Sequence, residues 1–306
     1  MQDNFETYQL SGWFPGHMFK AGKQMSDALK LVDMAIELVD ARAPLATRNP
    51  ALRQILEGKP FQIVANKADL ASPAANRAWE QYCADNGLQI HFLDSRRTQN
   101  VKHLPQLWRQ IVMDARAARG ATRPLLRPIR VIIAGVPNVG KSTLVNHLFE
   151  KNRAQVGPKP GVTRANQWIP LQDNVELLDT PGILWPKITS KKHELLLALL
   201  GIFNEEVIQR ELIADYLAWS LETKQIPINW SDYGLQAPPE TGDDLLNAIA
   251  TKRGFRRAGN QLDTERAAIA FVKDFRDKKM GRISLEMPPE PPASSTATMP
   301  QQTMNN

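Results

Sequence analysis

The chain has 306 residues, a formal net charge of +6 and a sequence pI of about 9.4. Its single cysteine, Cys83, excludes an intramolecular disulfide and a cysteine cluster that could hold a metal. The sequence shows no signal-peptide pattern and no run of the roughly 18 apolar residues that a membrane span needs. We therefore expect a soluble, cytoplasmic protein with two domains. The basic balance suits a polyanionic partner, such as nucleic acid or an anionic membrane surface, and equally suits simple solubility.

Short apolar runs alternate with helix-periodic segments in the first part of the chain. Such runs suit strands buried in a parallel sheet, and the segments between them suit helices on its faces. A stretch rich in Gly, Pro and Arg then has the composition of a linker. The predicted elements are strands at 34–40, 61–65 and 88–93, helices at 49–57, 72–86 and 101–119, and a linker at 119–128.

The alternation resumes after the linker and stops near residue 190. Beyond that point only helix-periodic segments remain. We therefore predict an α/β domain with a mainly parallel sheet, followed by an all-helical C-terminal domain. The predicted elements are strands at 129–134, 167–171 and 174–179, an irregular loop at 152–166, and helices at 141–151, 191–200, 205–219, 242–253 and 263–276.

These patterns also divide the chain into segments. Low-complexity composition at the end predicts a disordered tail, because such a sequence cannot bury enough apolar surface to fold. The predicted divisions are an N-terminal segment at 1–30, the α/β domain at 31–190, the helical domain at 200–285 and the tail at 286–306.

The segment G-V-P-N-V-G-K-S, Gly135–Ser142, follows an apolar strand and precedes a helix. It matches G-x-x-x-x-G-K-[ST], in which glycines let the backbone wrap phosphates and successive N–H groups supply a positive field. Lys141, a candidate catalytic residue, can reach the β- and γ-phosphates, and Ser142 can bind Mg²⁺. The predicted phosphate-binding residues are Pro137, Asn138, Val139, Gly140, Lys141, Ser142 and Thr143.

Two later segments suit the γ-phosphate side of such a site. In D-T-P-G, Asp179 ends a strand and can hold Mg²⁺ through water, while Gly182 can donate its N–H to the γ-phosphate. Thr163, in P-G-V-T-R, lies in the irregular loop and can complete the Mg²⁺ shell when a γ-phosphate is present. We predict that Ser142, Thr163 and Asp179 bind Mg²⁺.

The segment N-K-A-D, which begins at Asn66, also ends an apolar strand. A carboxylate such as Asp69 can accept hydrogen bonds from guanine N1 and N2, a donor pair that adenine lacks. The stem of Lys67 can cover the base. The pair Ser95-Arg96, after the next strand, lies where a backbone N–H can read guanine O6, although GTPases usually carry Ser-Ala there. These residues predict binding of GTP and GDP.

The order of the two half-sites is reversed relative to ordinary GTPases, in which the phosphate loop comes first. The sheet can stay unchanged if the old termini are joined and new termini open elsewhere, which proteins tolerate where termini lie close together. Residues 119–128 would be that join. The sequence therefore predicts a circularly permuted P-loop GTPase domain.

The chain resembles the ribosome biogenesis GTPase A family, also called the YlqF type, over nearly all of residues 11–285. The resemblance rests on W-F-P-G-H-M, D-A-R-A-P, N-K-A-D, G-x-P-N-V-G-K-S, D-T-P-G and G-R-I-S-L-E in this order. It implies a GTPase that acts late in assembly of the large ribosomal subunit and whose hydrolysis the particle stimulates. It also implies that the helical domain contacts ribosomal RNA.

The resemblance implies two further roles. Ile183 follows D-T-P-G where Ras-like proteins carry a water-positioning glutamine, so catalysis needs another group. In the family that candidate is a histidine of the P-G-H-M segment, here His17, for which a structural role is the alternative. Asn138 would help to hold K⁺ beside the phosphates.

The segment from Thr251 to Arg282 has ten basic and four acidic residues, a surplus of +6. Such a surface can bind backbone phosphates, and a solvated helix face is the alternative. The basic residues are Lys252, Arg253, Arg256, Arg257, Arg266, Lys273, Arg276, Lys278, Lys279 and Arg282.

The leading hypothesis is a GTP hydrolase that binds the large ribosomal subunit precursor and its rRNA, without stable membrane association and as a monomer off the ribosome. One alternative is a GTP-regulated RNA-binding module with little hydrolysis. Another is a GTPase that acts on tRNA modification or on membranes, against which the absence of an apolar anchor and the basic helical domain count.

Overall fold

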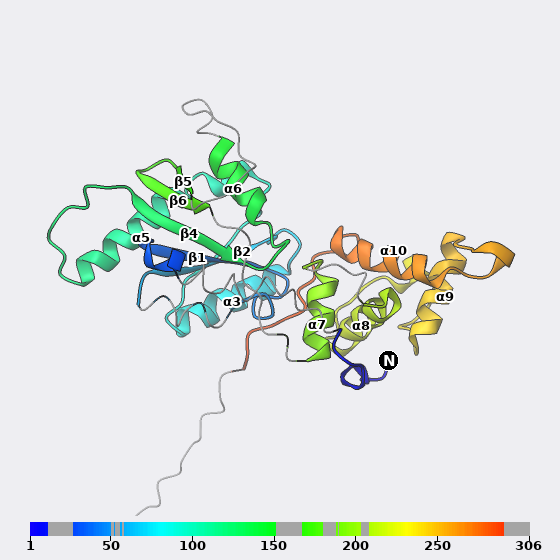
Figure 1. The fold of residues 1–306 in the computed structure, drawn as a ribbon. Coiled ribbons are helices and arrows are strands. Elements are labelled where there is room, and N and C mark those ends of the chain that lie inside the picture. Colours follow the sequence, from blue (N-terminus) through cyan, green and yellow to red (C-terminus); the bar gives the residue numbers. More distant parts are fainter. Residues whose placement is uncertain are drawn as a thin grey trace, which may run out of the picture.

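The computed structural model describes residues 1–11, 27–49, 52, 56, 58–150, 167–179, 188, 190–202 and 208–290. An α/β region and a helical region lie next to each other in it (Figure 1). The predicted fold class, a mainly parallel sheet with helices followed by a helical C-terminal region, is therefore confirmed.

The α/β region is built on a six-stranded sheet in the order β3-β2-β1-β4-β6-β5. Neighbouring strands are parallel except β5 and β6, which run antiparallel. The central strands β1 and β4 are buried along nearly their whole length, as expected for apolar strands covered on both faces. The bounds are β1 Met34–Asp40, β2 Phe61–Asn66, β3 Ile90–Phe92, β4 Ile129–Gly135, β5 Gln167–Pro170 and β6 Val175–Asp179.

The helices of this region pack through apolar side chains at helical spacing. In α5, Leu104, Trp108 and Val112 are buried, and a spacing of four residues places them on one face. The predicted helix at 101–119 is divided, and α5 begins with Pro105 in its first turn, where proline fits best. The predicted helix at 49–57 lies largely outside the described residues. The bounds are α3 Pro73–Asp85, α4 Thr98–Val101, α5 Leu104–Ala118 and α6 Lys141–Glu150.

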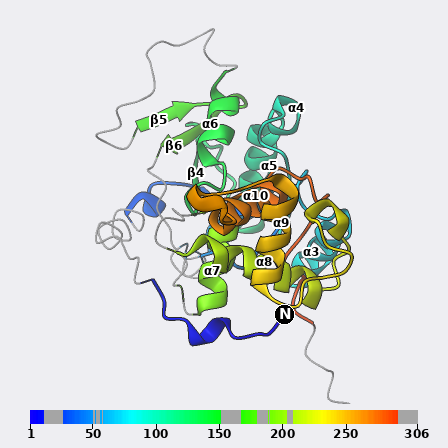
Figure 2. The ribbon, with the colours of Figure 1, turned by 90° about the vertical axis from the view of Figure 1, so that its right-hand side faces the viewer.

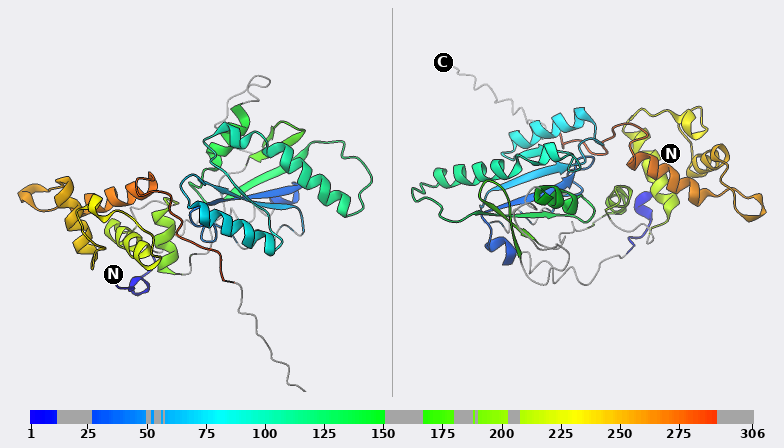
Figure 3. Two further views of the ribbon diagram at one scale, coloured as in Figure 1. Left: turned by 180° about the vertical axis from the view of Figure 1, so that it is seen from behind. Right: turned by 90° about the horizontal axis from the view of Figure 1, so that it is seen from above.

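The predicted linker at 119–128 has neither helix nor strand. Through α5 it joins the edge strand β3 to the central strand β4, and it lies at the end of the α/β region away from the helical region (Figures 1 and 3). Arg127 fixes its end, because the guanidinium forms an ion pair of 2.7 Å with Asp33 just before β1. The connection from edge to centre is the one that permutation requires.

The helical region contains α7 Lys191–Leu199, α8 Arg210–Thr223, α9 Gly242–Arg253 and α10 Thr264–Arg276, and α8 and α10 pack closely (Figure 2). The helix predicted at 205–219 begins at Arg210 and continues to Thr223, because Leu221 is buried in the core. A capping box between Thr241 and Asp244 begins α9. Among the described residues, no helix combines the length and apolarity that a membrane span requires.

The C-terminal segment returns from the helical region to the α/β region. The Ile283 N–H donates to the Leu70 carbonyl at 3.0 Å, and the Leu285 N–H donates to the Arg42 carbonyl at 2.7 Å. The Glu286 carboxylate accepts from the N–H of Leu45 at 2.8 Å. Glu286, predicted as the first residue of the tail, is therefore part of the fold; residues 291–306 lie outside the described residues.

Candidate nucleotide-binding site

The phosphate loop connects the carboxyl end of β4 to the first turn of α6. A Cβ on Gly135 would meet the Leu38 carbonyl oxygen at 2.6 Å, so β1 and β4 need glycine there. Gly140 has a φ of +104°, and a Cβ there would lie 2.2 Å from Asn66 Nδ2. Both glycines are thus required by close approach, and the loop ends at a helix N-terminus that favours phosphate.

Asn66 joins the two half-sites directly. Its Nδ2 donates to the Val139 carbonyl of the phosphate loop at 2.8 Å, and its Oδ1 accepts from the Ser95 N–H at 2.9 Å. Only 2% of Asn66 is exposed, so both bonds are shielded from water. The structure therefore brings together the base-reading and phosphate-reading segments that the sequence separates.

Asp69 lies after β2, and its two carboxylate oxygens have different surroundings. Arg96 Nη2 donates to Asp69 Oδ2 at 2.6 Å. Asp69 Oδ1 is buried and has no hydrogen-bond partner among the residues that the structure describes. A buried acceptor without a donor is unfavourable, so this oxygen fits a ligand that brings N–H groups.

The sequence places Arg96 directly after Ser95 but does not show the ion pairs that Arg96 makes. Its guanidinium bridges Asp69 and Asp94, and its backbone N–H donates to Asp94 Oδ1 at 3.0 Å. Hydrogen bonds to this arginine hold the pKa of Asp94 below its ordinary value against the effect of burial. The signal was a basic residue directly after the serine.

The remaining loop residues show where ions and phosphates could be bound. Ser142 is exposed in the first turn of α6, and Lys141 and Thr143 are half-buried beside it. Asn138 has a φ of +56°, and its Nδ2 donates to the Gly201 carbonyl of the helical region at 3.0 Å. Pro137 is half-buried.

Some predicted site residues lie outside the described residues: His17, Thr163 and Gly182, together with Ile183. Asp179 ends β6, although its side chain is not described. Since β6 pairs in parallel with β4, the backbone of Asp179 lies at the sheet edge that carries the phosphate loop. The Mg²⁺ site stays a prediction.

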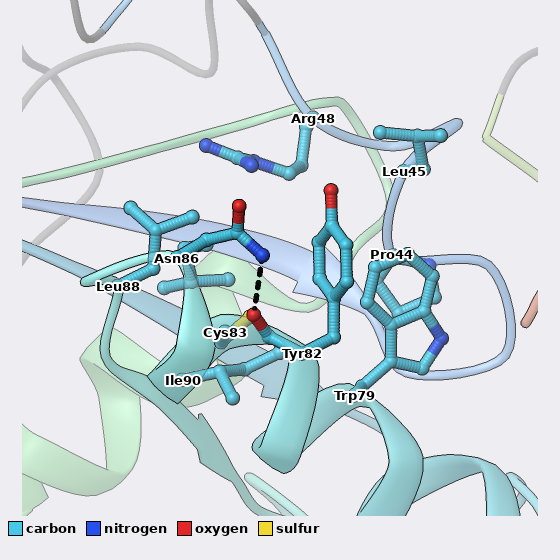
Figure 4. A pocket seen from close by; sticks show the side chains of 10 residues that line it. Pro44, Leu45, Arg48, Trp79, Tyr82, Cys83, Asn86, Leu88 and Ile90 are labelled. Carbon is cyan, nitrogen blue, oxygen red and sulfur yellow. Dashed lines mark hydrogen bonds between the residues drawn. The ribbon is translucent and has the colours of Figure 1, made fainter. Parts of the chain in front are cut away.

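A cavity of about 210 Å³ lies elsewhere, between α3 and the turn after β1 (Figure 4). Trp79 and Tyr82 form one wall, and Arg48 lies across from them with its guanidinium paired to Glu37 at 2.9 Å. Cys83 lines the cavity, and burial raises the pKa of its thiol. None of the predicted nucleotide-binding residues lines this cavity.

The basic segment of the helical region retains its charge surplus in the fold. Each of its four acidic residues forms an ion pair with a basic residue of the same segment. Asp274 pairs with Arg253 and Lys279. Asp263 and Glu265 pair with Arg257, and Asp277 pairs with Lys273. Arg256 instead donates to a neutral carbonyl, that of Asn260, at 2.9 Å. The guanidinium of Arg266 lies 4.4 Å from the Phe255 ring centroid.

A phosphate loop and an N-K-x-D loop, bonded to each other at the carboxyl edge of one mainly parallel sheet, define a P-loop GTPase domain with its halves in permuted order. A family model described as "50S ribosome-binding GTPase" matches residues 130–226. A ribosome biogenesis GTPase A from Bacillus cereus is 39% identical over 282 residues, which cover 91% of this chain and 94% of that protein. The chain therefore belongs to the ribosome biogenesis GTPase A family and is a GTP hydrolase.

Other relatives agree in fold and length. The mouse mitochondrial ribosome-associated GTPase 1 is 34% identical over 302 residues, covering 92% of this chain and 91% of that protein. The crystal structure of GNP-bound YlqF from T. maritima is 28% identical, with a TM-score of 0.63, and covers 88% of this chain and 98% of that chain. A GDP-bound YlqF structure has a TM-score of 0.62 at 28% identity, covering 87% of this chain and 99% of that chain.

Proposed function

We propose that this protein binds a precursor of the large ribosomal subunit, promotes a late step of its assembly, and hydrolyses GTP to GDP and phosphate there. The observation that carries the proposal is the bond from Asn66 to Val139, because it unites the guanine-reading and phosphate-reading halves in one site. Family membership supports the ribosomal role.

Guanine specificity would come from Asp69. Its Oδ1, buried and without a partner among the described residues, and its Arg96-bound Oδ2 lie on a carboxylate that can accept from guanine N1 and N2. Asn66 would keep Ser95 and the phosphate loop in register, and Lys67 would cover the base. The phosphates would contact Pro137, Asn138, Val139, Gly140, Lys141, Ser142 and Thr143.

A Mg²⁺ ion at this site would take most of its shell from water and phosphates. The described residues contain no group of three His, Cys, Asp or Glu side chains that could hold a metal alone. Ser142, exposed at the start of α6, would hold Mg²⁺ together with Thr163 and Asp179. When bound, the ion neutralises charge on the phosphate oxygens. K⁺ beside Asn138 would add a second positive charge.

Catalysis would rest on Lys141 and His17. Lys141 would stabilise charge on the phosphates, and His17 would orient or deprotonate the attacking water, a role that Ile183 cannot fill. GTP would favour binding to the particle, and hydrolysis would favour release. Arginines and lysines of residues 251–282 would bind rRNA phosphates. We place the protein in the cytoplasm, as a monomer off the ribosome.

The test is GTP hydrolysis by the purified protein in K⁺ or Na⁺, with and without large ribosomal subunits. We expect strong stimulation by the particle, higher turnover in K⁺, and a loss of about 100-fold in stimulated turnover for His17→Ala with GTP affinity intact. No stimulation under any condition would refute the mechanism and favour the GTP-regulated RNA-binding module with little hydrolysis.

A further inference from the structure

We propose that Asp40 is a positioning residue for guanine recognition. Its buried carboxylate fixes the ammonium of Lys67. Through Arg42 it also connects the guanine-reading loop, residues 66–69, to the helical region. The inference rests on the proposed guanine site. Asp40 ends β1 and pairs in register with Asn66, the last residue of β2. Asp40 therefore lies at the carboxyl end of the parallel strands, where the guanine-reading loop begins.

The contacts of Asp40 leave it little freedom. The side chain is 0% exposed, and its Oδ1 accepts from the backbone N–H and Nε of Arg42 at 3.0 and 2.9 Å. Its Oδ2 accepts from Arg42 Nη2 at 2.8 Å and lies 3.0 Å from Lys67 Nζ. One buried carboxylate thus orients two cations.

This arrangement determines where the Lys67 stem lies. Lys67 has a φ of +59°, in the left-handed region that non-glycine residues seldom adopt, and its Nζ reaches Asp40 at the end of β1. With Nζ held by Asp40, the four-carbon stem is ordered before a ligand arrives. Ordering a lysine ahead of binding removes one entropic cost of association.

Arg42 extends the network to the helical region. Its guanidinium lies 5.2 Å from the ring centroid of Phe275 in α10, and its carbonyl accepts from the Leu285 N–H at 2.7 Å. The segment after α10 also contacts the guanine-reading loop, because Arg282 Nη2 donates to the Ala68 carbonyl at 3.1 Å. Base recognition and the position of α10 therefore share one set of contacts.

A double-mutant cycle with Asp40→Asn and Lys67→Met tests the proposal, with dissociation constants for GDP, IDP and ADP measured by calorimetry on the full chain. Lys67 would cover the face of the base, which guanine and hypoxanthine share. We therefore expect each single variant to weaken GDP and IDP equally, by about three- to tenfold, with the GDP/IDP ratio unchanged. In the Lys67→Met background, Asp40→Asn should change affinity by less than about twofold.

The matched control is Asp33→Asn, just before the other end of β1. Asp33 accepts from Arg127 Nη1 at 2.7 Å, so the substitution also breaks an ion pair of the same strand, and we expect unchanged affinity for GDP. If Asp40→Asn does not fold, the affinity of Lys67→Met for GDP still tests the proposal. This variant keeps an apolar stem and leaves Asp40 paired with Arg42. Wild-type affinity in Lys67→Met would overturn the proposal, as would fully multiplicative effects in the cycle.

Failure of the guanine site itself would look different. The wild-type protein would then bind ADP as tightly as GDP, before any variant is compared. A preference for GDP together with multiplicative effects would instead leave the site standing and refute only the role of Asp40.

Discussion

Asp40 of the α/β region is fully buried and Asp215 of the helical region is half-buried, and their pKa values shift in opposite directions. Burial alone would raise the pKa of Asp40, but Arg42 and Lys67 hold it far below its ordinary value. Asp215 in α8 has no such cation among the described residues: burial raises its pKa to about 6, and the nearby Asp243 and Glu211 add to the shift. Its Oδ1 is buried and without a partner among the described residues. Asp274 in α10 is buried like Asp40, and its pairing with Arg253 and Lys279 likewise lowers its pKa, so partners, more than depth, decide whether a shielded carboxylate stabilises this fold.

The two aspartates predict opposite dependences on pH. The lowered pKa of Asp40 gives stability that is present above the unfolded value near 4 and is lost only in strong acid. The raised pKa of Asp215 means that the folded state binds its proton more tightly than the unfolded state does. Stability from this group therefore falls as pH rises from about 4 to about 6, and the deficit persists at neutral pH.

The largest expected effect concerns the α/β region, where Gly140→Ala should abolish the contact between the half-sites. The side chain would enter the space of Asn66 Nδ2 at a φ of +104°. We expect affinity for GDP, measured by calorimetry, to fall at least about 100-fold. Gly254→Ala is the matched control, because Gly254 also has a positive φ of +66° but a Cβ added there would meet nothing within 4 Å. Equal loss of affinity in both variants would contradict the close approach.

Asp215→Asn tests whether the ionised carboxylate of Asp215 destabilises the helical region. Removing the ionised form should raise the free energy of unfolding at pH 7.5 by about 1–3 kcal/mol. The gain should vanish below about pH 4, where the carboxyl of the wild-type protein is protonated in both the folded and the unfolded state. Urea unfolding at several pH values measures this, and Asp243→Asn should give a smaller gain. Destabilisation at pH 7.5 would show that the ionised carboxylate has a stabilising partner.

The smallest effect concerns the surface charges of the helical region. Lys278→Ala should weaken binding to a fragment of large-subunit rRNA a few-fold and reduce the slope of log K against log salt by about one. Lys273→Ala should change the slope less, because Lys273 already pairs with Asp277 at 2.8 Å. Equal slopes for both variants would indicate that ion pairing does not decide which cations meet RNA.

The sequence predicted the features that depend on neighbouring residues. Apolar runs such as 34–40 and 129–134 became β1 and β4, and the glycines of the phosphate loop lie where close approach requires them. The pairing of Asp40 with Lys67 and the bridge made by Arg96 could not be read from the sequence, because they join strands that are adjacent only in the folded sheet. The start of α8 at Arg210 was not predicted either: Gln209, just before it, has a ψ of 125°, outside helical geometry.

The most direct test of the account is the nucleotide preference of Asp69→Asn, measured as dissociation constants for GDP and XDP. Xanthine presents an N1–H donor and an O2 acceptor, which an asparagine amide can match, whereas the aspartate matches the two donors of guanine. We predict that the wild-type protein prefers GDP and that the variant prefers XDP by at least about tenfold. A variant that still prefers GDP would contradict the account, because Asp69 would then serve only its ion pair with Arg96.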